Sequence, residues 1–176
     1  AIESIARGSL KPSRFMLHLD VEKDVLNPPK TLKRLKNRGL EIILSENLGP
    51  HTKIQPWLIN NTEFDKPHVV ADDDIIYPRW WLKKLCNSHS KNPKIIHTYR
   101  SHMMVVDENK KTLTPYNSWP QGLGKPTNLN FATCVSGVLF PVNFLIIMKN
   151  SGDEYRSKCP RNDDLWLTFL AIENDI

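Results

Sequence analysis

Short apolar runs alternate with segments of helical periodicity along this chain, and the alternation limits the folds that it can adopt. Runs typical of β-strands occupy residues 14–19, 40–44, 68–71, 94–99 and 134–140. The first is apolar on both faces until Asp20, as strands buried in a parallel sheet are. Strands that alternate with helical patterns favour an α/β domain. We therefore predict one domain over residues 1–176, with a mixed, mainly parallel sheet flanked by helices.

The helical segments and one hairpin can be placed from residues that start or end such elements. Helices are expected to begin at Pro29, Gly49, Pro78 and Asn162. Gly39 is expected to close the first of these as a C-cap. Residues 103–106 and 112–114 bracket a charged turn and predict a β-hairpin.

Composition excludes several classes of protein. The 176 residues are 40% hydrophobic and 24% charged, which is ordinary for a globular protein. A formal charge of +5 suits an anionic partner without requiring one. The three cysteines are far apart and form no CxxC pair, which argues against a disulfide scaffold or a zinc ribbon. No apolar run approaches the ~20 residues that a membrane span needs, so we expect a soluble protein.

Three consecutive carboxylates, Asp72, Asp73 and Asp74, directly follow the apolar run at 69–71. Because apolar pairs flank them on both sides, we expect them to be at least half buried, where unpaired carboxylates repel one another and lose hydration. A hard divalent cation, Mg²⁺ or Mn²⁺, would neutralise them. Alternation along an extended chain points Asp72 and Asp74 to one side, which favours these two as metal ligands. The alternative is that the aspartates cap the helix that begins near Pro78.

Two motifs, taken together, resemble a known family. Residues 69–78 read VVADDDIIYP, residues 159–167 read CPRNDDLWL, and GVLFP lies between them at 137–141. In this order they resemble bacterial glycosyltransferases of the type-A fold, in particular the surface-polysaccharide group. The resemblance covers residues 1–170 and implies a nucleotide-diphospho-sugar transferase fold. Such enzymes normally begin with a strand that cradles the nucleoside base, so the resemblance also implies a domain truncated at its N-terminus and incomplete.

The resemblance assigns roles to the acidic triplet and to one lysine. In these enzymes a DxD motif holds Mn²⁺ or Mg²⁺ on the diphosphate of the donor, which implies metal binding by Asp72 and Asp74 and nucleotide-sugar binding by Asp72 and Asp73. A basic residue near the nucleotide corresponds to Lys53, at the start of an expected helix. Without the resemblance, Lys53 is interpreted equally well as a solvated lysine.

The resemblance also assigns the catalytic base. In these enzymes a late acidic pair takes the proton of the acceptor hydroxyl, which implies Asp164 as the base and Asp163 as its supporter or as a ligand of the acceptor. Two adjacent carboxylates cannot share one environment, so one of them can hold a pKa suited to proton transfer. Taken alone, the pair would be interpreted as acids that complement the dipole of the last helix.

Four further residues are weaker candidates. Arg100 and His102 follow an expected strand, where they would reach the diphosphate or the acceptor; an ordinary ion pair and an interior histidine are equally compatible. Trp119 lies in an irregular stretch and suits stacking on an acceptor sugar, although core packing is the commoner role of tryptophan. Gly137 would let the donor sugar approach the backbone closely, and a strand bulge is its alternative.

The sequence therefore predicts a metal-dependent glycosyltransferase that moves a sugar from a UDP- or GDP-type nucleotide-diphosphate sugar to a hydroxyl of a glycan or lipid-linked acceptor, in bacterial surface polysaccharide synthesis. We expect it in the cytoplasm, with peripheral association at the inner face of the membrane, and we expect no nucleic acid as partner. Two alternatives stay open. A metal-dependent nucleotidyl- or phosphotransferase uses paired acids in a similar way, and a non-catalytic basic module would bind nucleic acid or anionic polysaccharide.

Overall fold

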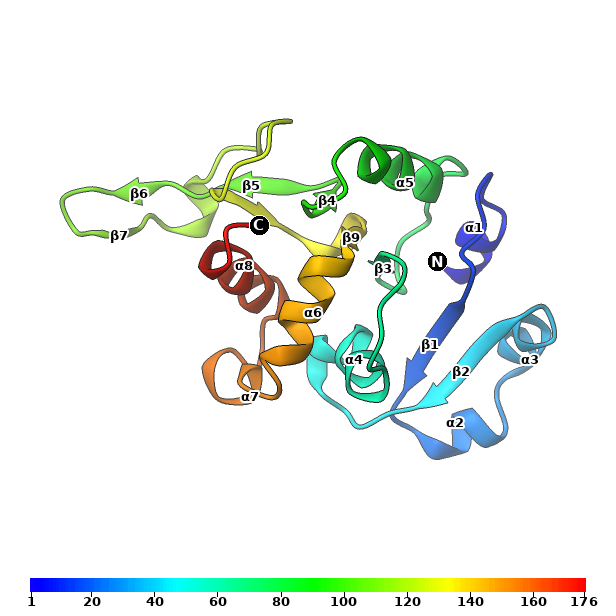
Figure 1. Cartoon of the computed structure of the whole chain (residues 1–176). Helices are drawn as coiled ribbons and strands as arrows, with labels where there is room; N and C mark the ends of the chain where they lie inside the picture. Colours follow the sequence, from blue (N-terminus) through cyan, green and yellow to red (C-terminus); the bar gives the residue numbers. More distant parts are fainter.

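The computed structural model describes residues 1–176 and contains four small sheets instead of one large sheet (Figure 1). The strands are β1 (Phe15–Leu19), β2 (Leu40–Leu44), β3 (His68–Val70), β4 (His97–Thr98), β5 (Ser101–Met103), β6 (Val106–Asp107), β7 (Thr112–Leu113), β8 (Asn130–Ala132) and β9 (Val138–Phe140). The helices are α1 (Ile2–Ala6), α2 (Glu22–Leu26), α3 (Lys30–Lys36), α4 (Gln55–Asn60), α5 (Trp81–Lys91), α6 (Val142–Asn150), α7 (Tyr155–Lys158) and α8 (Asp163–Glu173). Three 3₁₀ helices complete the chain: η1 (Gly49–Lys53), η2 (Tyr116–Ser118) and η3 (Cys134–Ser136).

The strands β1 and β2 form the parallel part of the structure. Phe15 lies opposite Leu40 and Leu19 lies opposite Leu44, so all five residues of each strand are paired. The helices α2 and α3 make the crossover that a parallel pair needs. After α3 the chain turns at Gly39, whose φ of +100° lies in the region that favours glycine. The two strands and the helix expected here are confirmed.

The strand β9 is the centre of a three-stranded sheet and runs antiparallel to both of its neighbours, β3 and β4. Val138 lies opposite Val70 on one side and opposite Thr98 on the other. Beyond this sheet the chain forms an arm in which β5 pairs with β8 and β6 pairs with β7, all antiparallel. The β6–β7 hairpin is expected from the sequence and projects from the body of the molecule (Figure 1).

The predicted fold class is wrong. The structure is a mixed α/β arrangement of small, mostly antiparallel sheets, with one two-stranded parallel sheet in place of a mainly parallel one. The apolar run at 134–140 is only partly a strand, because its first residues form η3. The rest, β9, inserts between β3 and β4 in the opposite direction. A local apolar pattern indicates that a segment is extended, but it carries no information on the direction of the partner strand.

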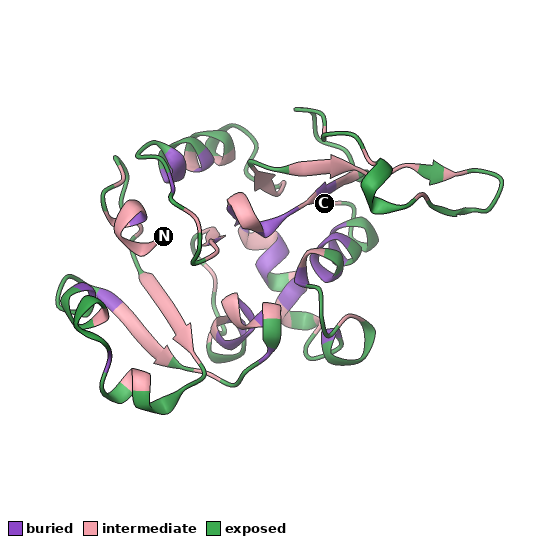
Figure 2. Ribbon diagram, turned by 180° about the vertical axis from the view of Figure 1, so that it is seen from behind, coloured by how far each residue is buried: buried purple, intermediate pink, exposed green.

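The larger hydrophobic core lies where α6 and α8 pack with β9. Its most buried side chains include Val138, Phe140, Phe144, Leu145, Met148 and Trp166, each at most 1% exposed. A smaller cluster joins α1 and α5 to the sheet and contains Ile5, Tyr77, Trp81, Leu82, Leu85 and Leu139. Figure 2 shows buried residues along α6 and α8, whereas β1 is half-buried throughout.

The helices are all short. None of them is long and apolar enough to cross a lipid bilayer.

Candidate functional site: two acidic motifs joined by a lysine

The two acidic motifs, distant in the sequence, meet at the side chain of Lys53. Its Nζ lies 2.8 Å from Oδ1 of Asp72 and 3.1 Å from Oδ2 of Asp163. All three side chains are largely enclosed, with exposed fractions of 22% for Lys53, 26% for Asp72 and 8% for Asp163. The sequence predicts these residues separately, and the structure brings them into one cluster.

Local structure positions each of these groups. Lys53 is the last residue of η1, and Asp72 stands two residues beyond the end of β3. Asp163 is the first residue of α8, whose N-cap Asn162 accepts a hydrogen bond from the backbone N–H of Leu165 at 2.8 Å. The free N–H groups of this helix end favour acidic side chains there. The helix therefore stabilises the late acidic pair and also presents it to Lys53.

Asp164 lies beside Asp163 in a different environment. Its Oδ1 accepts a hydrogen bond from the backbone N–H of Cys134 at 2.9 Å. Burial raises the pKa of the Asp164 carboxyl; the hydrogen bond from Cys134 lowers it, and the neighbouring charge of Asp163 raises it further. A raised pKa is the property that a proton-accepting carboxyl needs.

The charge of Lys53 is strongly stabilised. Burial alone would lower its pKa, but the charges of Asp163 and Asp72 and the hydrogen bond to Asp72 outweigh burial and raise the pKa above its ordinary value. Lys53 therefore stays protonated at every physiological pH and holds the two acidic motifs together.

Tyr77 holds the start of the acidic triplet through a hydrogen bond to the backbone of Asp72. Its hydroxyl accepts a hydrogen bond from the backbone N–H of Asp72 at 2.9 Å and donates to the carbonyl of Val135 at 3.2 Å. Burial raises the pKa of Tyr77 to about 12. The tyrosine thus links the segment after β3 to η3, the helix that begins at Cys134.

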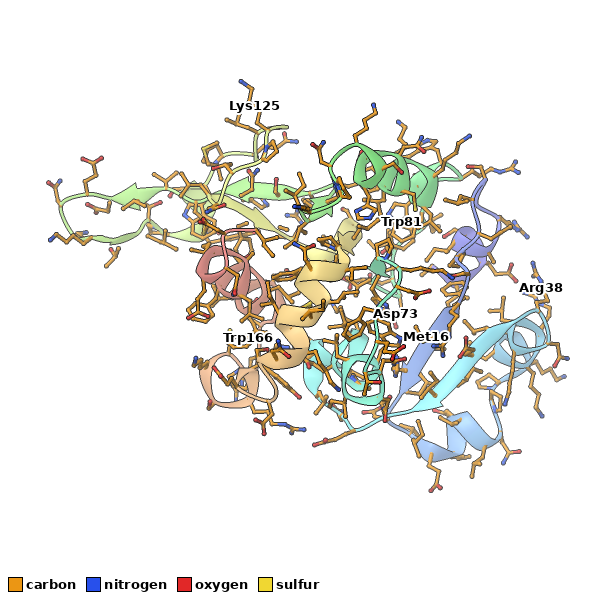
Figure 3. The ribbon with its side chains drawn as sticks, in the orientation of Figure 1. Met16, Arg38, Asp73, Trp81, Lys125 and Trp166 are labelled. Carbon is orange, nitrogen blue, oxygen red and sulfur yellow. The ribbon has the colours of Figure 1, made fainter.

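A cavity of about 960 Å³ opens beside this cluster. Lys53 and the whole triplet Asp72, Asp73 and Asp74 line it, together with β1 and β3. Asp73 and Asp74 are exposed and form no ion pair, in contrast to Asp72. In Figure 3 the labelled Asp73 and Met16 lie in the space between β1 and the body of the molecule. The expectation that all three acids are at least half buried therefore holds for Asp72 alone.

Two sets of side chains here have the chemistry to hold a metal ion. Asp72 and Asp74 offer hard carboxylate oxygens that face the cavity, as Mg²⁺ and Mn²⁺ prefer. Cys134, Asp163 and Asp164 offer a thiol and two carboxylates whose ligand atoms lie within 4.8 Å of one another. Burial, together with the charges of Asp164 and Asp163, raises the pKa of the Cys134 thiol, so the thiolate that metals bind is disfavoured. The ligand atoms are brought together in the buried set, whereas Asp72 and Asp74 border the cavity.

The structure does not bring the four weaker candidates to the cavity. Arg100 is exposed at the base of the arm, and His102 is part of β5. The ring centroids of Trp119 and Phe131 lie 5.5 Å apart. The Nε1 of Trp119 donates a hydrogen bond to the carbonyl of Thr114 at 3.0 Å. These contacts give Trp119 a packing role in the arm.

Gly137 has a structural role that the sequence did not reveal. Its φ is +95°, and a Cβ added there would lie only 2.3 Å from the indole ring of Trp81. The neighbouring carbonyl of Ser136 accepts a hydrogen bond from Trp81 Nε1 at 2.8 Å. Close approach of Trp81 to the backbone accounts for this glycine.

Two residues at the cluster are not predicted from the sequence. Cys134 stands there as an isolated cysteine, and Tyr77 only as part of the VVADDDIIYP motif. No spacing rule connects Cys134 to Asp164, thirty residues later, because that contact depends on how β9 and α8 pack. Tyr77 follows Asp74 by three residues, which was the one available indication that it packs near the triplet.

Comparison with known proteins adds no assignment, because neither a protein-family model nor a curated protein matches the chain.

Proposed function

We propose that this protein is a metal-dependent glycosyltransferase that moves a sugar from a nucleotide-diphosphate sugar to a hydroxyl acceptor. One observation carries the proposal: Lys53 joins the triplet that begins at Asp72 to the late pair that begins at Asp163, beside a cavity of about 960 Å³. Sugar transfer from such a donor needs acids of two kinds. One set of carboxylates holds the metal on the diphosphate, and one further carboxylate accepts the proton of the acceptor hydroxyl.

The triplet supplies the donor side of the site. Asp74 and Asp72 would hold Mn²⁺ or Mg²⁺, which when bound offsets the charge that builds up on the departing diphosphate. Asp74 is exposed toward the cavity and free of ion pairs, so it can bind a cation without breaking an internal contact. A UDP- or GDP-type donor fits this role, with Lys53 as a cationic group on the same wall.

The late pair supplies the acceptor side. As the sugar leaves its diphosphate oxygen and bonds to the acceptor oxygen, the proton of the acceptor hydroxyl passes to a carboxylate. We assign this role to Asp164, because burial raises its pKa toward the range where proton transfer is efficient. Asp163, held 3.1 Å from Lys53 Nζ, keeps the pair in position. Asp164 does not line the cavity, so this role requires a movement that brings its carboxylate into contact with the acceptor hydroxyl.

A thermal-shift series tests donor binding. UDP, GDP and their sugars are each added with and without Mn²⁺, and the melting temperature Tm is measured. A ligand at a hundredfold excess over its Kd stabilises by about 2.7 kcal/mol, which for a chain of this size raises Tm by about 5–10 °C. The rise should require Mn²⁺.

Two variants make this test specific. Asp74→Asn removes one cavity-facing charge without breaking an ion pair, so it should keep the basal Tm and lose the Mn²⁺-dependent rise. Glu108→Gln is the matched control, because Glu108 is an exposed acid at the tip of the β6–β7 hairpin. Equal ligand-induced rises in both variants would contradict the proposal. Stabilisation by nucleoside triphosphates with release of pyrophosphate would favour nucleotidyl transfer, and salt-sensitive, metal-independent binding of DNA would favour the basic module.

A further inference from the structure

The net positive charge of the chain is concentrated in one segment without acids. Residues 75–106 contain six lysines and arginines and no aspartate or glutamate, whereas the remaining 144 residues contain 18 lysines and arginines and 19 acids. The six cations are Arg79, Lys83, Lys84, Lys91, Lys94 and Arg100. None of them forms an ion pair. The segment therefore carries positive charge that the rest of the chain does not neutralise, and this favours an anionic partner.

This segment forms α5 and β4, and a small cleft of about 240 Å³ lies where the two meet. Figure 1 shows α5 and β4 side by side, at a distance from β1. The cleft is lined mainly by polar and cationic residues, which include Lys84, Asn87, Ser88, Lys91, His97 and Tyr99. No acidic residue lines it. An anion in the cleft would therefore meet positive charge without a competing carboxylate.

Two lysines of α5 contribute the charge of the cleft. Lys84 and Lys91 are seven positions apart, about two helical turns, so they lie on the same face of α5. The Nζ of Lys84 lies 4.2 Å from the centre of the Trp80 ring, a cation–π contact that restricts where its ammonium group can lie. Trp80 in turn meets Tyr99 edge-on, with 5.7 Å between the ring centroids. The aromatic pair therefore holds one of the two cations at the cleft.

Neutral hydrogen-bond donors accompany the two lysines. The side chains of Asn87 and Ser88 line the cleft, are exposed and make no hydrogen bond within the chain. Tyr99 is anchored instead, because its hydroxyl donates a hydrogen bond to the carbonyl of Trp81 at 2.6 Å. The cleft therefore offers two positive charges, an amide and a hydroxyl that are all free to bind a ligand.

We propose that the cleft between α5 and β4 binds a phosphate group, either free inorganic phosphate or the terminal phosphomonoester of a larger molecule. A phosphomonoester has a charge of about −1.5 to −2 near pH 7 and three strong acceptor oxygens. Its charge matches that of Lys84 and Lys91, and its oxygens accept hydrogen bonds from ammonium, amide and hydroxyl groups. A carboxylate matches the pair less well, because it carries a single charge.

This cleft is separate from the cavity beside the acidic cluster, because the two share no lining residue. Leu82 and Cys86 of α5 line the cavity, and Lys84 and Ser88 line the cleft. An offset of two residues turns an α-helix by about 200°, so the two sites lie on opposite faces of α5. The proposal therefore does not rest on the proposed sugar transfer, and either can fail without the other.

An NMR titration of the whole ¹⁵N-labelled chain tests the site. Inorganic phosphate is added at constant ionic strength without Mn²⁺, and the amide shifts are followed. The amides of residues 84–91 and 97–99 should shift and saturate with a Kd on the order of 1 mM, because the two lysines are exposed and partly screened. A hexose 6-phosphate is titrated in the same way. Tighter binding of the sugar phosphate would assign the group to a larger molecule, and equal or weaker binding would assign it to free phosphate.

Three lysines of the same helix supply the variants and their control. Lys84→Gln and Lys91→Gln each remove one charge from the cleft and should weaken phosphate binding about fivefold or more, since a charge-assisted hydrogen bond is lost. Lys83→Gln removes the same charge from α5 at a position outside the cleft, so it should change the Kd by less than about twofold. All three lysines are exposed, so the variants should fold, and the spectrum of each variant shows whether it does.

Three outcomes would overturn the proposal. One is that phosphate shifts only residues 53 and 72–74, which would place it in the cavity beside the acidic cluster. A second is equal weakening by Lys83→Gln and Lys84→Gln, which would indicate general attraction to a basic surface without a site. A third is that single-stranded DNA shifts residues across the whole of 75–106 while phosphate shifts none of them, which would assign the segment to a polyanion.

Discussion

Two regions of the molecule have similarly apolar sequences but bury them to very different degrees. One is the body around β9, and the other is the β1–β2 unit. In the body, Leu139, Phe144 and Leu145 have no exposed surface. In β1, the equally apolar run from Phe15 to Leu19 is half-buried along its whole length. Apolar content is therefore similar in the two regions, and the difference comes from the number of neighbouring elements. The structural cause is the open edge of β1, which pairs with β2 alone.

The acidic cluster lies at the junction of these two regions. Lys53 lines the cavity that β1 borders, and it also contacts Asp163 at the start of α8 in the body. Its second partner, Asp72, follows β3 on the cavity wall. The cluster is therefore anchored to the well-packed region and faces the poorly packed one.

The largest expected contrast is between two phenylalanines. Phe144→Ala should lower the free energy of unfolding by about 4 kcal/mol, because it leaves a cavity in a close-packed core. Phe15→Ala should lower it by about 2 kcal/mol, because that side chain is only partly buried against the smaller core. Urea unfolding of both variants measures the difference. Equal losses would show that β1 is as well packed as the body.

Lys53→Met should lower the free energy of unfolding by about 2–3 kcal/mol, because it leaves Asp163 buried beside Asp72 without a cation. The raised pKa gives the sign of the pH dependence. The stabilisation is complete below pH 10.5, the ordinary pKa, and is lost as the pH rises through the higher pKa of the folded state.

The matched control is Lys158→Met, because the Lys158–Glu154 ion pair is exposed and should contribute nothing measurable. Adding Asp163→Asn to Lys53→Met should recover part of the loss, since it removes the unpaired charge. A double variant no more stable than Lys53→Met alone would show that the lysine acts by packing.

His68 should make the cavity wall sensitive to acid. Burial, with the nearby charges of His18 and Arg14, lowers the pKa of His68 to about 4, and its ring stacks on Trp57 at 4.1 Å. A lowered histidine pKa stabilises the fold above pH 6.5, and this stabilisation is lost as the pH falls toward 4. We expect a loss of about 3 kcal/mol over this interval, and a smaller one in His68→Gln. Urea unfolding of the parent and of His68→Gln at several pH values measures this loss. Identical pH profiles of the two proteins would contradict the prediction.

The smallest effect on stability is expected for Asp164→Asn, which keeps the oxygen that accepts from Cys134 N–H. Because the pKa of Asp164 is raised in the folded state, its ionised form opposes folding, and the opposition grows as the pH rises through that pKa. The variant should therefore be slightly more stable than the parent at pH 7 and equal to it near pH 3. If the proposed base is correct, the same variant loses at least a hundredfold in sugar transfer while donor-induced stabilisation stays unchanged.

The sequence predicted individual elements better than their arrangement. The strands at β1, β2 and β3 and the helix α5 with its buried Trp81 were found, because each has a local pattern of apolar residues. The sheet was predicted wrongly, since the direction of β9 between β3 and β4 depends on contacts that are remote in sequence.

The candidate site, like the fold, was predicted in its individual residues but not in their arrangement. Asp72, Asp163 and Lys53 were singled out by residue type and motif, and the structure groups them. Their common contact was not predicted, because it arises only when η1, β3 and α8 converge. Leu165 and Phe169 of α8 are exposed whereas Trp166, Leu167 and Leu170 are buried, and helical spacing alone does not fix which face meets α6.

The β6–β7 hairpin extends away from both the cavity and the acidic cluster (Figure 1). Its turn, residues 108–111, is exposed throughout and pairs with no other part of the chain. Exposed loop tips of this kind tolerate insertions. A fluorophore, an affinity tag or a surface-immobilisation handle placed at this tip would leave the residues that line the cavity untouched.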